Sequence, residues 1–133
     1  MTVHIPNGMV PVAALFMAAG CFFSVQALIW AAFYNLAIIF LAMPGVMITG
    51  AASWKFRYKG ASTPLFKTKI FCSILLFVAS GAILLWQILR PINPQHLTIE
   101  SWAMVAAYAA LLAPTARAGA LGGKLIFAAR KKI

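Results

Sequence analysis

Very few side chains of this sequence could carry out acid–base, nucleophilic or metal chemistry. Its 133 residues include one acidic residue, Glu100, and two histidines, His4 and His96. The only charged side chain inside a long apolar run is Arg117. The sequence contains no cluster of ligands at metal-binding spacing, no nucleophile–base pair and no phosphate-cradling glycine loop. It therefore predicts no catalytic site and favours a protein that is not an enzyme.

The composition indicates which elements carry these few residues. Apolar residues make up 64% of the chain and charged residues 9%, which is too little charge to cover a soluble domain of this length. Lysine and arginine number 11 against one acidic residue. In a soluble protein this excess would suggest nucleic acid, but the cations occupy short segments between apolar runs and form no basic helix face. We expect an all-α integral membrane protein that binds no nucleic acid.

A basic segment from Trp54 to Lys69 divides the chain between two long apolar runs. Because it contains no acidic residue, it must lie in water or among lipid headgroups rather than in hydrocarbon. Its cations are candidates for contact with anionic lipid or with a partner protein. They are Lys55, Arg57, Lys59, Lys67 and Lys69.

Four apolar stretches predict a single-domain four-helix membrane bundle. The expected spans are approximately 9–23, 27–53, 70–89 and 101–126. A tight turn is expected at Ser24-Val25-Gln26, and Arg90-Pro91 should close the third span. Thr98-x-x-Ser101 is a weak capping pattern for the fourth span, with Glu100 in its first turn.

Prolines should shape three of these spans. Pro11 is expected in the first turn of its helix, where a missing N–H group costs little. Pro44, followed by Gly45, and Pro114 should each kink the helix that contains them.

The distribution of cations predicts the orientation. With four spans, both termini and the basic segment share one face, and Arg90 is the only cation on the other. Because lysine and arginine are retained on the cytoplasmic side, both termini should be cytoplasmic, in the inner membrane of a bacterium. Trp30, Trp86 and Trp102 fall at the far interface, as an aromatic belt would. The cations of the cytoplasmic face are Lys55, Arg57, Lys59, Lys67, Lys69, Lys124, Arg130, Lys131 and Lys132.

Haem and quinone are the cofactors left open. Ligation of one haem by two histidines needs both imidazoles at one depth, whereas His4 and His96 belong to opposite faces. His4 could serve alone or with a ligand from another subunit, or it could be a solvated or capping residue. Arg117 could face a haem propionate, a quinone oxygen or a lipid phosphate; alternatively, its stem could extend to the basic interface. A proton-coupled exchanger is disfavoured because Glu100 lies at an interface.

The fourth apolar stretch contains small residues at helical spacing. Ala116, Gly119, Ala120 and Gly123 form a small-xxx-small stripe that would let helix backbones approach closely. It predicts packing within the bundle, with a subunit interface as the alternative. Ala106, Ala109, Ala110 and Ala113 continue the small residues along the helix. Candidates for hydrogen bonds between helices are Gln26, Asn35, Thr49, Ser73, Ser80 and Gln87.

Short motifs resemble those of a known family. His4-Ile-Pro6-Asn-Gly-Met-Val-Pro11 is similar to the His-x-Pro opening of the DUF2231-type four-helix membrane proteins. Gly119-Ala-Leu-Gly122-Gly123-Lys-Leu-Ile-Phe127 resembles the Gly-Gly-x-Leu-Val-Tyr/Phe motif that closes that family's last span. The segment from Trp54 to Lys69 is similar to a variant associated with anaerobic, cytochrome-rich bacteria.

The resemblance implies a redox membrane setting, because some relatives are fused to, or work beside, c-type haem modules. Relatives often carry a histidine where this chain has Ala120. If that histidine pairs with the equivalent of His4 to hold a cofactor, the resemblance implies that half of the pair is missing here, which favours a structural role.

The preferred hypothesis is a small accessory or anchor subunit of a larger membrane complex, respiratory or redox, with cytochromes among its expected partners and no chemistry of its own. One alternative is a haem b- or quinone-binding membrane electron carrier that uses His4 and Arg117. Another is a small solute channel or exporter, for which the sequence offers few polar lining groups.

Overall fold

The regular structure is helical throughout the described part of the chain. A computed structural model describes residues 4–57, 59 and 64–130, and the side chains of residues 4–6, 57, 122 and 125–130 lie outside that description. The helices are α1 (His4–Phe22), α2 (Gln26–Arg57), α3 (Pro64–Leu89), α4 (Ile99–Ala110) and α5 (Leu112–Arg130). Because hydrocarbon offers no hydrogen bonds, long apolar segments satisfy their backbone groups internally, as helices do.

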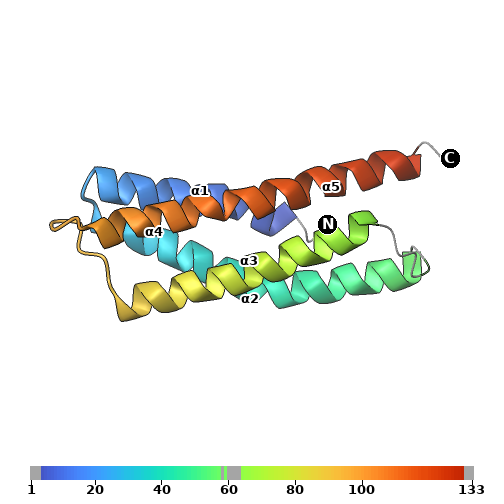
Figure 1. The fold of residues 1–133 in the computed structure, drawn as a ribbon, viewed down its shortest axis with the longest axis horizontal. Coiled ribbons are helices and arrows are strands. Elements are labelled where there is room, and N and C mark those ends of the chain that lie inside the picture. Colours follow the sequence, from blue (N-terminus) through green and yellow to red (C-terminus); the bar gives the residue numbers. More distant parts are fainter. Residues whose placement is uncertain (1–3, 58, 60–63, 131–133) are drawn as a thin grey trace.

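The helices form a bundle of four rods, because α4 and α5 follow one another as a single rod interrupted at Leu111 (Figure 1). Both α1 and α3 pack against α2 and against the α4–α5 rod, so α1 and α3 occupy opposite corners. The turn after α1 and the connection 90–98 lie at one end, which we call the connection end (Figure 1). The basic end is the opposite one, where α2 gives way to α3.

Three helical stretches are long and apolar enough to cross a membrane: Gln26–Phe56, Pro64–Leu89 and Ile99–Leu121. The apolar stretch found in α1, Asn7–Phe22, is shorter. Figure 1 shows that α1 starts short of the basic end. The prediction of an all-helical fold is confirmed for the described residues, and three of the four expected spans lie in helices long and apolar enough to cross a membrane.

The helices extend beyond the apolar stretches that predict them. α2 continues through Trp54 to Arg57, and α3 begins at Pro64, a residue suited to the first turn of a helix. Intrahelical hydrogen bonds do not end where hydrocarbon ends, so hydropathy marks only the apolar part of each helix. The tight turn after α1 is confirmed, with Ser24 at φ 56°.

The position of Pro11 differs from expectation, and Pro114 lies just after an interruption of its rod. Pro11 lies inside α1, because that helix begins at His4, so its placement in the first turn is wrong. The rod that contains Pro114 is interrupted at Leu111, in the turn before this proline. Pro114 has no N–H group to bond the carbonyl of the residue four positions earlier. The Leu111 carbonyl accepts from Thr115 N at 3.3 Å and from Thr115 Oγ1 at 2.7 Å.

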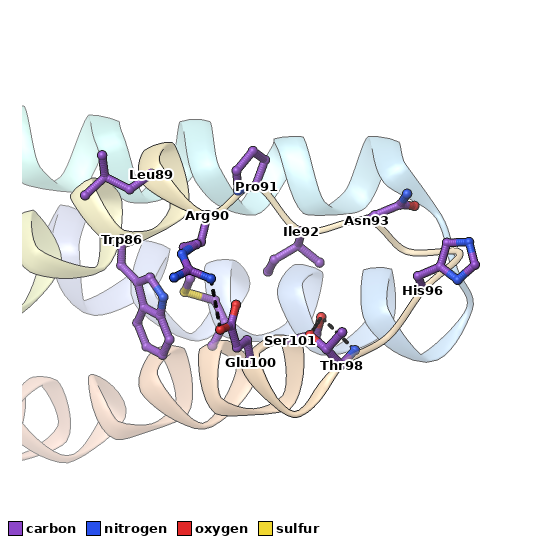
Figure 2. Close-up of a pocket in the computed structure, with 11 residues that line it drawn as sticks. Trp86, Leu89, Arg90, Pro91, Ile92, Asn93, His96, Thr98, Glu100 and Ser101 are labelled. Atoms are coloured by element: carbon purple, nitrogen blue, oxygen red, sulfur yellow. Dashed lines mark hydrogen bonds and ion pairs between the residues drawn. The ribbon is translucent and has the colours of Figure 1, made fainter.

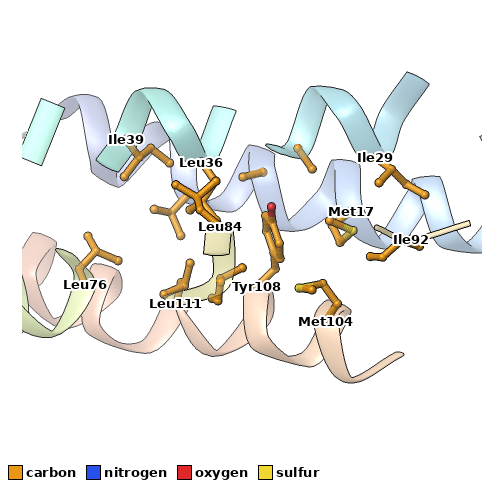
Figure 3. Close-up of a cluster of buried hydrophobic side chains, with 14 of the residues drawn as sticks. Met17, Ile29, Leu36, Ile39, Leu76, Leu84, Ile92, Met104, Tyr108 and Leu111 are labelled. Atoms are coloured by element: carbon orange, nitrogen blue, oxygen red, sulfur yellow. The ribbon is translucent and has the colours of Figure 1, made fainter. Parts of the chain in front are cut away.

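A buried apolar cluster joins the rods (Figure 3). Tyr108 projects from α4 into this cluster and is 1% exposed. Close approach of α1 and α2 depends on Gly20, where a Cβ atom would lie 2.7 Å from Ile29 Cγ1 and 3.0 Å from the Ile29 backbone nitrogen. The labelled members are Met17, Ile29, Leu36, Ile39, Leu76, Leu84, Ile92, Met104, Tyr108 and Leu111.

Candidate functional site

A polar cavity of about 380 Å³ lies beneath the connection between α3 and α4 (Figure 2). Arg90 Nη1 donates to Glu100 Oε1 at 3.2 Å, and the two side chains are 67% and 57% exposed. A pair this exposed is screened by water and holds its neighbours weakly. The lining residues include Trp86, Asn93 and His96, and Figure 2 shows His96 at the tip of the connection, away from the ion pair.

Local hydrogen bonds set the course of this connection. Thr98 is the N-cap of α4, and its N–H donates to Ser101 Oγ at 3.4 Å. Asn93 Oδ1 accepts from the Gln95 N–H at 3.0 Å. The capping pattern predicted at Thr98 and Ser101 is confirmed, and Glu100 lies in the first turn, where the helix dipole favours an anion.

A second cavity, of about 210 Å³, lies between α2 and α3 at the same end. Its lining includes the buried side chains of Ile29, Gln87 and Ile92, which are 2%, 7% and 9% exposed. Gln87 Oε1 accepts a hydrogen bond of 2.7 Å from the hydroxyl of Tyr108. The remaining lining residues are Gln26, Trp30, Phe33, Ile88 and Pro91.

One of the expected hydrogen bonds between helices is the bond to Gln87. Ser73 and Ser80 instead donate to carbonyls of their own helix, at Lys69 and Phe77. The Asn35 Oδ1 atom is buried without a partner. Sequence alone could suggest Gln87, as an amide within an apolar run, but it could not identify Tyr108 as its partner.

The basic cations gather at the end opposite the two cavities. The side chains of Lys55, Lys59 and Lys67 are exposed, and Lys69 is half-buried. Arg57 is the last residue of α2. This end is therefore available to anionic headgroups or to an acidic partner.

The predicted cofactor residues come from α1 and α5. His4 begins α1, and its side chain is outside the described part, so its pairing with Arg117 stays a prediction. Arg117 is exposed on α5. Among the described residues, no three histidine, cysteine or acidic side chains are grouped closely enough to hold a metal ion.

The small-residue stripe is divided between the inside and the outside of the bundle. A Cβ atom on Gly119 would lie 2.9 Å from Asn7 Nδ2, so Gly119 packs against α1. Ala116 and Ala120 are exposed, and a Cβ atom on Gly123 would meet no described atom within 4 Å. The exposed alanines belong to a longer face that we call the alanine face: Ala103, Ala106, Ala109, Ala110, Ala113, Ala116 and Ala120.

No family model, curated protein or solved structure matches this chain.

Proposed function

We propose that this chain is an accessory or anchor subunit of a larger membrane complex and that it contacts its partner through the alanine face of α4–α5. The supporting observation is a contrast between outer surfaces. The exposed positions of α3 between residues 70 and 89 are mostly large apolar side chains such as Phe71, Val78 and Leu85. The outer surface of α4–α5 is dominated by alanine.

Small outer residues suit contact with another helix. Lipid tails offer no hydrophobic advantage to association between helices, so partner helices are held by close packing and polar contacts, which small residues permit. Large side chains on α3 would keep a partner backbone farther away. The alanine face is therefore the outer surface best suited to a partner helix.

Arg117 lies on α5 among these alanines and favours a partner different from this chain. At about 1.5 Å per residue it lies roughly 22 Å along the rod from Trp102, which places it within a hydrocarbon layer about 30 Å thick. A cation at that depth is stabilised by an anion or by extension of its stem to the basic interface. Glu100 is the only acidic side chain of the chain and pairs with Arg90 at the connection end. A second copy docked on this face would bring two Arg117 cations together, whereas a partner carboxylate would neutralise one.

The proposed setting is a bacterial inner membrane with both termini cytoplasmic. The support is the concentration of lysine and arginine at the basic end, because such residues are retained on the cytoplasmic side. A redox complex with cytochrome partners is part of the proposal only through the resemblance to DUF2231-type proteins. A reporter fused to either terminus should be active only if that terminus is in the cytoplasm.

Photo-cross-linking in native membranes tests the contact face. A photoreactive residue in place of Ala113 should give one protein adduct of defined mass, and the same residue in place of Ala82, which is exposed on α3, should label lipid. Arg117→Leu should weaken the adduct at position 113. Equal lipid labelling at both positions would refute the proposal that the alanine face contacts a partner. An adduct of twice the chain mass would show that the partner is a second copy of this chain and would refute the proposal of a different protein.

A further inference from the structure

The cavity between α2 and α3 is lined by the Gln87 amide, which a hydrogen bond from a buried residue of α4 holds in place. Gln87 comes from α3 and is 7% exposed. Its Oε1 atom accepts from the Tyr108 hydroxyl at 2.7 Å, and Tyr108 is itself 1% exposed. With one lone pair of Oε1 engaged by this hydroxyl, the donors of the amide are the two N–H bonds of its NH₂ group.

This NH₂ group is accessible from the cavity. Gln87 lines the cavity. Among the described residues, the one side-chain atom that is fully buried without a partner is Asn35 Oδ1, so Gln87 Nε2 is not such an atom. No described group accepts from Nε2, so it is open to the space that Gln87 lines. The cavity therefore presents a hydrogen-bond donor, and a ligand with an acceptor oxygen would complement it.

The walls around this donor suit a flat ring. Trp30 and Phe33 lie edge to face, with ring centroids 5.9 Å apart and an interplanar angle of 86°. Ile29 and Ile92 add buried aliphatic surface. Apolar cavities of about 150 Å³ take up benzene in other proteins, so the roughly 210 Å³ here can hold a substituted ring.

The rim connects the cavity to the lipid phase. Trp30 is 49% exposed and Ile88 is 62% exposed, and both belong to helices apolar enough to span a membrane. Gln26, the first residue of α2, places the cavity near the interfacial end of that span. A molecule dissolved in the bilayer could insert a ring laterally and leave an apolar tail among the lipids.

We propose that this cavity binds the ring of a lipid-soluble quinone, with the Gln87 amide donating to a ring carbonyl and with Trp30 and Phe33 forming the wall. A glycerolipid ester also carries a carbonyl, but it has no flat ring to place against an aromatic wall. The neighbouring polar cavity is less suited to such a ligand, because its charged groups already pair with each other. This site is distinct from the alanine face, so either proposal can fail without the other.

Quinone binding can be measured on the full chain in phospholipid nanodiscs. The chain has four tryptophans, and phenylalanine in place of Trp54, Trp86 and Trp102 leaves Trp30 as the only fluorescent reporter. Titration with 2-methyl-1,4-naphthoquinone should quench Trp30 to a saturable limit. The carbonyl-free analogue 2-methylnaphthalene, added as a competitor, should bind about fivefold more weakly, as expected for one net hydrogen bond.

Variants assign the carbonyl contact to Gln87. Gln87→Met should weaken quinone binding by about the same fivefold and leave the hydrocarbon analogue unaffected. Gln87→Met leaves the buried Tyr108 hydroxyl without its acceptor, and the double variant with Tyr108→Phe removes that hydroxyl. The affinities of the quinone and its hydrocarbon analogue can then be compared again without an unpaired buried group. Ile88→Phe should narrow the rim without adding a second tryptophan and should weaken both compounds, whereas Gln95→Met, in the exposed connection, should affect neither.

Three outcomes would overturn the proposal. One is quenching that rises linearly with concentration, as for simple partitioning into lipid. Another is equal affinity for the quinone and its hydrocarbon analogue. The third is a retained phospholipid, detected by native mass spectrometry and lost in Ile88→Phe, in a protein that binds no quinone.

Discussion

The connection end and the basic end of the bundle are packed differently. At the connection end, all four rods contribute side chains that are almost fully buried, such as Met17, Ile29 and Met104. Toward the basic end, α2 has no buried residue between Met47 and Phe56, and α3 has none between Pro64 and Phe71. Thr115 is the last buried residue on α5 among the described side chains.

The difference follows from the length of α1. This helix starts short of the basic end, so among the described residues no fourth helix lies beside α2, α3 and α5 there (Figure 1). Three rods cannot surround a core as four can, and the sides that remain open must face lipid, headgroups or another protein. The comparison suggests that the connection end supplies most of the stability and the basic end supplies surface for contacts.

The largest expected effect compares a buried and an exposed leucine on α2. Leu36 is fully buried and Leu41 is 76% exposed. Leu36→Ala should lower the free energy of unfolding by about 2 kcal/mol, which is the low end of the range for buried leucines in soluble proteins. The low value is expected because helices in lipid are held by packing, without a hydrophobic driving force between them. Leu41→Ala should change it by less than about 0.5 kcal/mol. Reversible unfolding in mixed micelles, followed by circular dichroism, measures both, and equal losses would contradict the comparison.

A second pair uses glycines at the two ends. At Gly20 the added methyl group of alanine would collide with Ile29, including its backbone nitrogen, whereas at Gly50 it would meet nothing within 4 Å. Gly20→Ala should therefore cost about 1–2 kcal/mol of unfolding free energy through overpacking between α1 and α2. Gly50→Ala should be neutral or stabilising by up to about 1 kcal/mol, because alanine favours helix. The same unfolding assay applies, and a stable Gly20→Ala protein would show that the contact between α1 and α2 is loose.

The buried hydroxyl of Tyr108 gives a smaller expected effect. Tyr108→Phe leaves Gln87 Oε1 without its donor and should cost about 0.6–1 kcal/mol, the usual range for hydrogen bonds within membranes. Tyr34→Phe is the matched control, because Tyr34 is 60% exposed. If both changes cost the same, the bond between Tyr108 and Gln87 contributes nothing to the connection end.

The smallest effect is expected at the Arg90–Glu100 ion pair. Both side chains are more than half exposed, so Arg90→Gln should lower the free energy of unfolding by less than about 0.5 kcal/mol, and the loss should shrink as salt is added. The measurement is unfolding at low and high ionic strength, with Lys67→Gln as an exposed control. A larger loss that is insensitive to salt would mean that the ion pair holds the connection in place.

The sequence predicts the local elements of this fold but not the contacts between its helices. The turn after α1 and the cap at Thr98 could be predicted because each depends on residues close together in the chain. The division of the small-residue stripe could not, because Gly119 and Ala120 are both small, and what lies opposite each of them is set by the packing of distant helices. The start of α1 at His4 was also missed, since a helix can extend beyond its apolar run.

The sequence by itself determined that this chain is helical, because long apolar runs and the demand for internal hydrogen bonds leave few alternatives. It predicted four spans, and three of them lie in helices long and apolar enough to cross a membrane. Only the tertiary structure decided that Tyr108 orients Gln87 beside an aromatic wall and that α4–α5 turns its alanines outward. Those arrangements depend on how helices distant in sequence pack together, which hydropathy along the chain does not encode.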